Sequence, residues 1–468
     1  MDIVKKDIAV IGGGPGGYVA ALRAAQLRKT VVLIEREAVG GTCMNWGCIP
    51  TKHLLHQTKL LREIRSSKTL NGPAAQISLN WARVQEDKSK VVDRLVRGVE
   101  FLLQRSGVDL IRGTGALRDE RRIAVRTSAG DERLVESGRI ILAAGSRPAE
   151  LSFLKFDGET VLSSTEALSF ATIPKSLLVV GAGAIGIEMG TIYSRLGTEV
   201  TILEILPGIL PDCDREIGRR LELLLKRQGL KIHTQSRIES FERKDGAAIL
   251  RGTSLKTNTP FEFSAEKVLL AAGRRANSER LCEGPPFIGL NRYGCVEVND
   301  NLETNVPGIA AIGDLIGGKL LAHKASHEGS AAAEAAAGGR GHVNDHALPM
   351  AVFTEPEFAS VGLTEEEARQ RDGDVRIGTF SFQANGRALT MDSPDGLVKI
   401  IVGKNDRILG AHILGACASD LIAEITLAMS RGLPAGAVAD AIHIHPTLSE
   451  AVMEAAAKAL GRAIHSLN

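Results

Sequence analysis

Two parts of the chain repeat the same order of apolar and helical segments. Continuous apolar runs at residues 7–11 and 30–34 flank an alanine-rich segment, residues 16–27, whose pattern predicts a helix. Apolar runs at 176–180 and 199–203 flank a second helical segment that ends near residue 196. The repeated strand–helix–strand order predicts an α/β fold with two Rossmann-like units.

The rest of the pattern predicts further domains. Apolar runs ending in glycine at residues 139–145 and 268–273 predict a returning strand after each unit. Residues 346–468 mix strand-like and helical segments and hold no glycine-rich loop, which indicates an α+β domain. We therefore expect four domains, at residues 1–149, 150–272, 273–345 and 346–468.

A glycine-rich loop follows the first strand of each unit. The loops share the GxGxxG spacing, and their glycines are Gly12, Gly14 and Gly17 in the first unit and Gly181, Gly183 and Gly186 in the second. The second strands end at Glu35 and Glu204, which can accept hydrogen bonds from a ribose. One such motif is a weak signal, but two in matching contexts predict two dinucleotide sites. Glu204 would repel a 2′-phosphate, which favours NAD over NADP.

A pair of cysteines follows the first loop. Cys43 and Cys48 are separated by four residues, a spacing that alone would allow a metal site, a structural bridge or a redox pair. The neighbouring nucleotide loop favours a redox pair, because a bound cofactor could exchange electrons with the sulfurs. Lys52 follows Cys48 by one helical turn.

Three other residues are candidates for chemistry. His445 and Glu450 could form an acid–base pair, in which the carboxylate orients the imidazole. Asp314 follows an apolar strand-like run and Gly313. A turn aspartate is the simpler interpretation, but the glycine permits close approach, and we favour a ligand to the ribityl chain of a flavin.

Composition excludes several classes of function. The net charge of the 468 residues is +2, which argues against a nucleic-acid surface, and no apolar run reaches the ~20 residues of a membrane span. The six cysteines are mostly scattered, unlike those of a secreted disulfide-rich protein. We expect a cytoplasmic protein without a metal site.

These motifs together resemble the pyridine nucleotide–disulfide oxidoreductases, and among them the dihydrolipoamide dehydrogenases most. The resemblance runs nearly end to end, from the first loop to the segment His443–Glu450. It implies an FAD-binding domain, an NAD-binding domain, a central domain that completes the FAD site and an interface domain of a homodimer. It also implies oxidation of dihydrolipoyl groups by NAD⁺ through FAD and a redox-active disulfide.

The resemblance assigns a role to each candidate residue. Cys48 would lie against the flavin as the charge-transfer thiolate, and Cys43 would exchange with substrate. Lys52 would pair with Glu188 beside the flavin, while His445 and Glu450 would serve the cysteines of the partner subunit. Further contacts are expected at Gly41, Thr42, Gly115, Gly145, Asp314 and Ala322 for FAD and at Gly273 for NAD.

The expected macromolecular partner is a lipoyl-bearing acyltransferase, or the carrier protein of a 2-oxo acid dehydrogenase or glycine cleavage complex. Among the alternatives, a glutathione-reductase-like enzyme is disfavoured by Glu204. A mercuric-reductase-like enzyme is disfavoured because the last cysteine is Cys417. A non-catalytic flavoprotein scaffold would be expected to lose some of the catalytic set, which is complete: Cys43, Cys48, Lys52, His445 and Glu450.

Overall fold

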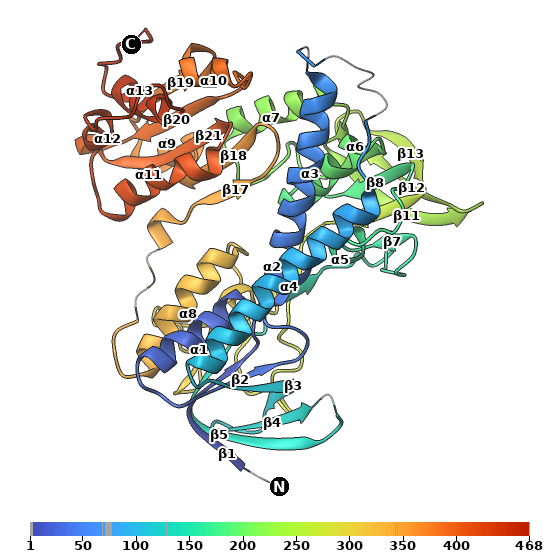
Figure 1. Ribbon diagram of the computed structural model, residues 1–468, viewed down its shortest axis with the longest axis vertical. Helices are drawn as coiled ribbons and strands as arrows, with labels where there is room; N and C mark the ends of the chain where they lie inside the picture. The colour runs from blue at the N-terminus through green and yellow to red at the C-terminus, as the bar shows by residue number, and fades with distance from the viewer. Residues whose placement is uncertain are drawn as a thin grey trace.

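The computed structural model describes residues 3–67, 69–70, 77–127, 129–341, 343 and 345–467. Its sheets lie in three regions (Figure 1). The first sheet is at the bottom, the second at the upper right, and the C-terminal sheet at the upper left. Long helices run between the first region and the other two.

The first sheet carries the first glycine-rich loop. Its strands are β1 (Ile3–Ile11), β2 (Val31–Glu35), β3 (Asp109–Leu117), β4 (Arg122–Thr127), β5 (Glu132–Leu142) and β16 (Ile309–Ala311). β1 pairs in parallel with β2 and β5, and its residues Ile8–Ile11 are almost completely buried. Burial on both faces explains why these strands are continuously apolar.

Helices from distant parts of the chain pack together beside this sheet. α1 (Pro15–Gln26) follows the first loop, and α8 (Ala322–Ala336) lies alongside it (Figure 1). The helices approach closely because both present small residues. A Cβ added at Gly329 would lie 2.3 Å from the carbonyl oxygen of Gly16. Since β16 also joins this sheet, the segment after residue 273 returns to the first unit.

The second sheet repeats the arrangement. Its order is β10 (Lys231–His233), β9 (Glu199–Leu203), β8 (Ser176–Val180), β14 (Lys267–Leu270) and β7 (Val161–Leu162), with α6 (Ala184–Arg195) after the second loop. An antiparallel sheet of β11 (Ser236–Lys244), β12 (Ala247–Ser254) and β13 (Thr259–Ala265) adjoins it. The short strands β6 (Ser146–Pro148) and β15 (Arg274–Ala276) pair where the chain crosses between the units.

A group of helices joins the first and second sheets. These helices are α2 (Gly41–Trp46), α3 (Cys48–Ser66) and α4 (Trp81–Arg105), while the short α5 (Ser164–Ala167) packs against β7, β14 and α6 of the second unit. One buried apolar cluster contains Leu54 from α3, Ile187 from α6 and Val352 from the C-terminal part of the chain. Helices α3 and α4, the second unit and the C-terminal part therefore share a core, which holds their relative positions.

The C-terminal sheet has the order β17 (Met350–Val352), β18 (Glu357–Gly362), β21 (Ile408–Gly415), β20 (Leu397–Val402) and β19 (Arg376–Ser381). Its helices are α9 (Glu365–Asp372), α10 (Gly386–Thr390), α11 (Ala418–Ser430), α12 (Ala435–Ala439) and α13 (Glu450–Ala459). β18, β21, β20 and β19 pair antiparallel, as the mixed pattern of this region predicts.

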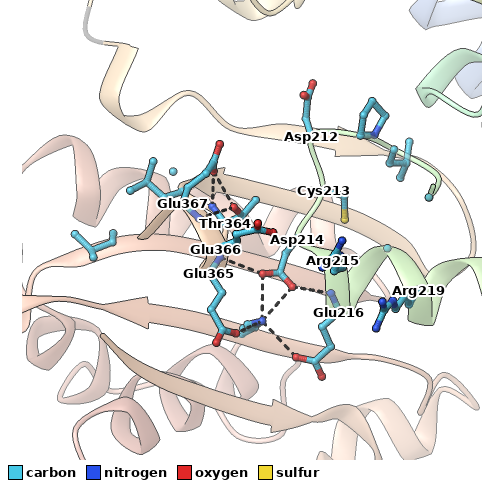
Figure 2. A pocket seen from close by; sticks show the side chains of 18 of the residues that line it. Asp212, Cys213, Asp214, Arg215, Glu216, Arg219, Thr364, Glu365, Glu366 and Glu367 are labelled. Atoms are coloured by element: carbon cyan, nitrogen blue, oxygen red, sulfur yellow. Dashed lines mark hydrogen bonds and ion pairs between the residues drawn. The ribbon is translucent and has the colours of Figure 1, made fainter. Parts of the chain in front are cut away.

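A buried cation links the C-terminal sheet to the second unit. Lys399 of β20 is 2% exposed, and its Nζ lies 3.0 Å from Asp214 Oδ1 and 2.7 Å from Glu365 Oε2. Asp214 also accepts a hydrogen bond from the backbone N–H of Glu216 at the start of α7 (Arg215–Arg227). Figure 2 shows these carboxylates converging in the groove between α7 and α9. Since carboxylates from both regions surround one ammonium, the cluster joins the two.

The observed architecture confirms the predicted α/β class with two Rossmann-like units and a C-terminal α+β part. Among the described residues, no helix is both long and apolar enough to cross a membrane.

Removal of the Lys399 charge should destabilise the fold strongly. Lys399→Ala leaves the buried carboxylate of Asp214 without its cation, and we expect a loss of about 3–5 kcal/mol in the free energy of unfolding. The control is Lys226→Ala, which removes the exposed partner of Glu222 on α7 and should cost below about 1 kcal/mol. Denaturant unfolding measures both. Equal effects would contradict a structural role for the buried cation.

Candidate active site

The first glycine-rich loop is open at the start of α1 and tightly packed behind it. A Cβ at Gly12, whose φ is +103°, would lie 2.3 Å from the carbonyl oxygen of Ala143, and one at Gly17 would lie 1.7 Å from that of Gly12. At Gly14 an added Cβ would meet nothing within 4 Å. The two packed glycines therefore fix the turn, while the helix N-terminus stays accessible to a phosphate group.

The second loop has the same geometry. A Cβ at Gly181 would lie 2.5 Å from the carbonyl oxygen of Ala271, and one at Gly186 would lie 2.0 Å from that of Gly181. Gly183 is open, as Gly14 is. Both loops thus fit a dinucleotide pyrophosphate at the start of a helix.

The acidic residues that end β2 and β9 hold their loops in the same way. Glu35 accepts hydrogen bonds from the backbone N–H groups of Gly13 at 2.5 Å and Glu37 at 2.6 Å. Glu204 accepts from Ala182 at 2.7 Å and Leu206 at 2.8 Å. Both carboxylates are buried at the edge of the loop, where a ribose attached to the pyrophosphate would lie.

The cysteine segment is attached directly to the first loop. The N–H of Gly40 donates to the carbonyl oxygen of Gly13 at 2.8 Å, and a Cβ at Gly41 would lie 2.7 Å from Gly14 Cα. Gly47 then separates α2 from α3, because a Cβ there would lie 2.7 Å from the carbonyl oxygen of Thr42. The break brings Cys43 of α2 near Cys48, the first residue of α3.

The two thiols are free in this structure and differ in acidity. A hydrogen bond from Cys43 and the positive charge of Lys52 lower the pKa of Cys48 to about 7, against the opposing effect of burial. The same hydrogen bond and burial raise the pKa of Cys43. The position of Cys48 at a helix N-terminus also favours a thiolate. Cys48 is therefore the sulfur that carries negative charge most readily.

Lys52 and Glu188 form an ion pair across the two units. Lys52 Nζ lies 2.7 Å and 3.0 Å from the two carboxylate oxygens of Glu188, whose side chain is 5% exposed. The lysine is on α3, one turn after Cys48, and the glutamate is on α6. The pair thus places a cation beside the cysteines.

Sequence reasoning missed one member of this cluster. Phe353 directly follows β17, and its ring centroid lies 4.6 Å from Lys52 Nζ. Its backbone N–H donates to Glu188 Oε1 at 3.0 Å. A phenylalanine just after an apolar strand carries no sequence signal for such a contact, because its partners are far away along the chain.

Asp314 is held by residues that the sequence did not single out. Its Oδ2 accepts a hydrogen bond from Ser146 Oγ at 2.5 Å, and Arg274 Nε lies 3.8 Å from the same oxygen. Arg274 also donates to Ser146 Oγ at 2.7 Å. Burial lowers the pKa of Arg274, and the negative charges of Asp314 and Cys48 oppose that shift. This polar cluster lies where the two crossing strands, β6 and β15, meet.

The remaining predicted cofactor residues lie on nearby elements. Thr42 is in α2, and Ala322 is the first residue of α8. Gly145 and Gly273, with φ of +66° and +121°, precede β6 and β15. Gly115 is in β3, where a Cβ would pack 3.2 Å from Ile34.

His445 and Glu450 form a separate cluster in the C-terminal part. His445 Nδ1 lies 2.9 Å from Glu450 Oε1, and the N–H of Thr447 donates to Glu450 Oε2 at 2.8 Å. The His445 side chain is 81% exposed, so its other ring nitrogen is accessible. His443 instead lies 3.0 Å from Glu424, and its side chain is buried.

Within one chain, the His445–Glu450 pair lies far from the Cys43–Cys48 pair. Figure 1 shows α12 and α13, which flank His445, at the upper left, well apart from α2 in the middle of the molecule. The neighbouring Ile442 and Ile444 are 102% and 77% exposed. Exposed isoleucines around an exposed acid–base pair indicate a surface that another molecule covers.

Comparison with protein families accounts for most of the chain. Residues 6–329 match the model of the pyridine nucleotide-disulphide oxidoreductases, and residues 348–456 match the dimerisation domain of the same family. The His445 cluster lies within the dimerisation domain.

Individual relatives match along the whole length. The chain is 42% identical to a dihydrolipoyl dehydrogenase of Geobacillus stearothermophilus, over 99% of this chain and 98% of the relative. It is 39% identical to the mitochondrial dihydrolipoyl dehydrogenase of Pisum sativum, over 98% and 93%. A solved structure, the Cu(II) complex of the HOCl-induced flavoprotein disulfide reductase RclA from Escherichia coli, has a TM-score of 0.86 and 26% identity, and the match covers 98% of this chain and 100% of RclA. The chain therefore belongs to the pyridine nucleotide-disulphide oxidoreductase family.

Proposed function

We propose that the protein is an FAD-dependent dihydrolipoamide dehydrogenase that oxidises dihydrolipoyl groups with NAD⁺. The observation that carries this proposal is the pair of unequal thiols, Cys43 and Cys48, which begins beside a dinucleotide loop and lies next to the Lys52–Glu188 ion pair. Relatives near 40% identity that bear this enzyme's name support the choice of substrate.

FAD would bind in the first unit. Gly12, Gly14 and Gly17 would hold its pyrophosphate at the start of α1, and Glu35 its adenosine ribose. Thr42, Asp314 and the start of α8 would hold the remainder, with Gly41, Gly115, Gly145 and Ala322 as backbone contacts. Bound there, FAD would supply a carrier for an electron pair between the dithiol and NAD⁺.

NAD would bind in the second unit, with its pyrophosphate on the loop formed by Gly181, Gly183 and Gly186, and with Gly273 beyond it. Glu204 would accept from the adenosine ribose and repel a 2′-phosphate. The domain boundaries proposed with these sites are 1–149 for FAD, 150–272 for NAD, 273–345 for the central domain and 346–468 for the interface.

The unequal thiols suit disulfide exchange. A substrate thiolate attacks Cys43 Sγ of the oxidised pair, the Cys43–Cys48 bond breaks, and its electron pair leaves on Cys48. A low pKa makes Cys48 the better leaving group. The second substrate thiolate then attacks the sulfur bound to Cys43, which forms lipoamide and releases Cys43. The substrate has lost two electrons, and the pair is now a dithiol.

His445 would move the protons of this exchange. The imidazole takes a proton from the attacking substrate thiol and returns it to the departing Cys43, while Glu450 fixes the tautomer through Nδ1. Because the histidine is remote from the cysteines of its own chain, we infer that it serves those of a partner subunit.

The proposed homodimer would act on lipoyl groups carried by another protein. The acyltransferase of a 2-oxo acid dehydrogenase complex, or the carrier protein of glycine cleavage, has the required chemistry. Cys213, Cys282, Cys295 and Cys417 are scattered and do not form the pattern of a disulfide framework, which supports a reducing cytoplasmic location.

Substrate rates test the activity directly. We expect rapid reduction of NAD⁺ by dihydrolipoamide, and at least a tenfold preference for NAD⁺ over NADP⁺, because repulsion at Glu204 opposes a phosphate. Glutathione disulfide with NADH or NADPH is the matched comparison in the reverse direction. Faster turnover of glutathione disulfide than of lipoamide would contradict the proposed substrate.

The roles of the two sulfurs can be separated by absorbance. In Cys43→Ser the Cys48 thiolate stays beside the flavin, so the oxidised holoprotein should show a long-wavelength charge-transfer band. The pKa of Cys48 is lowered to about 7 in the native pair, so the band should be complete at alkaline pH and fade from neutral pH downward as the thiolate becomes protonated. Cys48→Ser should lack the band. A band in Cys48→Ser instead would reverse the two roles.

Mixed dimers test the shared site. Co-expression of Cys48→Ser and His445→Gln chains with different affinity tags yields dimers in which one site pairs an intact dithiol with the partner's intact histidine. We expect about half the activity of the wild-type dimer, since one of two equivalent sites works. Purified mixed dimers that hold FAD but do not oxidise dihydrolipoamide would show that each chain builds its own site.

A further inference from the structure

Phe353 contacts both members of the Lys52–Glu188 ion pair. Its ring faces the Lys52 ammonium at 4.6 Å, and its backbone N–H donates to Glu188 Oε1 at 3.0 Å. The ring therefore acts on the cation while the backbone acts on the anion. These contacts come from a segment that belongs to neither dinucleotide unit.

The neighbours of Phe353 fix its position. Val352 before it is fully buried in the core that α3 and α6 share. Glu355 after it lies 3.0 Å from Arg195 of α6, whose side chain is 5% exposed. Arg195 also donates to the carbonyl oxygen of Leu55 on α3. Phe353 is thus held between the two helices that carry the ion pair.

Lys52 needs such a contact more than Glu188 does. The Glu188 side chain is 5% exposed, whereas that of Lys52 is 33% exposed. A lysine has a flexible stem, and a partly exposed ammonium can turn toward water. An aromatic face attracts an ammonium and restricts it, so the ring limits the positions that Lys52 can adopt.

The position of Lys52 matters for Cys48. The lysine follows Cys48 by one turn of α3, and its charge contributes to the lowered pKa of that thiol. If the Lys52 ammonium moved away from Cys48, its charge would lower the pKa of the Cys48 thiol less.

We propose that Phe353 is a positioning residue that holds the Lys52 ammonium beside Cys48 and thereby sets how readily Cys48 carries negative charge. This inference rests on the proposed function for the placement of FAD against Cys48. It assigns to the C-terminal part of each chain a role in its own electron-transfer site.

The test uses holoprotein carrying Cys43→Ser, in which the charge-transfer band reports the Cys48 thiolate. Phe353→Leu keeps an apolar side chain and the backbone N–H but removes the aromatic face. We expect the pH midpoint of the band to rise by about 0.3–0.7 units. This rise corresponds to a two- to fivefold fall in the acid dissociation constant of the Cys48 thiol. Phe353→Tyr keeps the ring and should restore the midpoint. Phe101→Leu, on the exposed part of α4, is the matched control.

A double-mutant cycle separates positioning from general packing. In a Lys52→Met background, Phe353→Leu should shift the midpoint no further, because the cation through which the ring acts is absent. An equal shift in both backgrounds would overturn the inference. An unchanged midpoint in Phe353→Leu with a lower unfolding temperature would also overturn it, since the ring would then have a packing role alone.

The pH midpoint of the charge-transfer band is measured without substrate, so it does not depend on which substrate the enzyme oxidises. If Phe353→Leu shifts the midpoint but the wild-type protein does not oxidise dihydrolipoamide, this inference is supported and the proposed substrate is contradicted. Absence of the band from every variant would contradict the placement of Cys48 against the flavin, and would overturn this inference with it.

Discussion

A nearly buried carboxylate requires a cation, and Glu188 is paired with a lysine from a helix that begins beside the other dinucleotide loop. This pairing ties the second unit to the start of α3, where Cys48 lies. The second glycine-rich loop precedes α6, which carries Glu188, so it cannot be placed independently of the cysteine pair. The C-terminal segment that contains Phe353 completes the same contact. This ion pair, together with the apolar core that α3 and α6 share, thus holds the cysteine segment against the second unit.

The two dinucleotide units are alike down to individual hydrogen bonds. In each, the strand-end glutamate accepts one hydrogen bond from the loop, 22 residues earlier, and one from the residue two positions later. The same local design therefore occurs at both proposed dinucleotide sites, and what distinguishes the two units lies outside the loops. The first unit adds the cysteine helix, and the second adds Glu188.

The sequence predicted features that depend on local pattern. The fold class and the family are confirmed, because parallel buried strands and GxGxxG turns leave a periodic signature. Phe353, Ser146 and Arg274 escaped prediction, since each acquires its role from residues that are distant along the chain. The Lys399 cluster escaped for the same reason, because a lysine within an apolar strand shows no sign of a buried partner. The predicted cofactor and catalytic residues remain proposals, although the structure brings Lys52 to Glu188 and His445 to Glu450.

The hydrogen bonds of Glu204 have a consequence for attempts to redesign the enzyme. A designer who wished to admit NADP would remove this carboxylate to eliminate charge repulsion. Its two oxygens, however, also satisfy the N–H groups of Ala182 and Leu206 at the edge of the loop. A buried donor without an acceptor costs about 1–3 kcal/mol, so a simple substitution would loosen the loop at which the pyrophosphate is proposed to bind. The proposed coenzyme choice and the rigidity of the loop would therefore reside in one side chain. Glutamine offers a single acceptor oxygen for these two N–H groups, so a redesign would also need a second acceptor from a neighbouring residue.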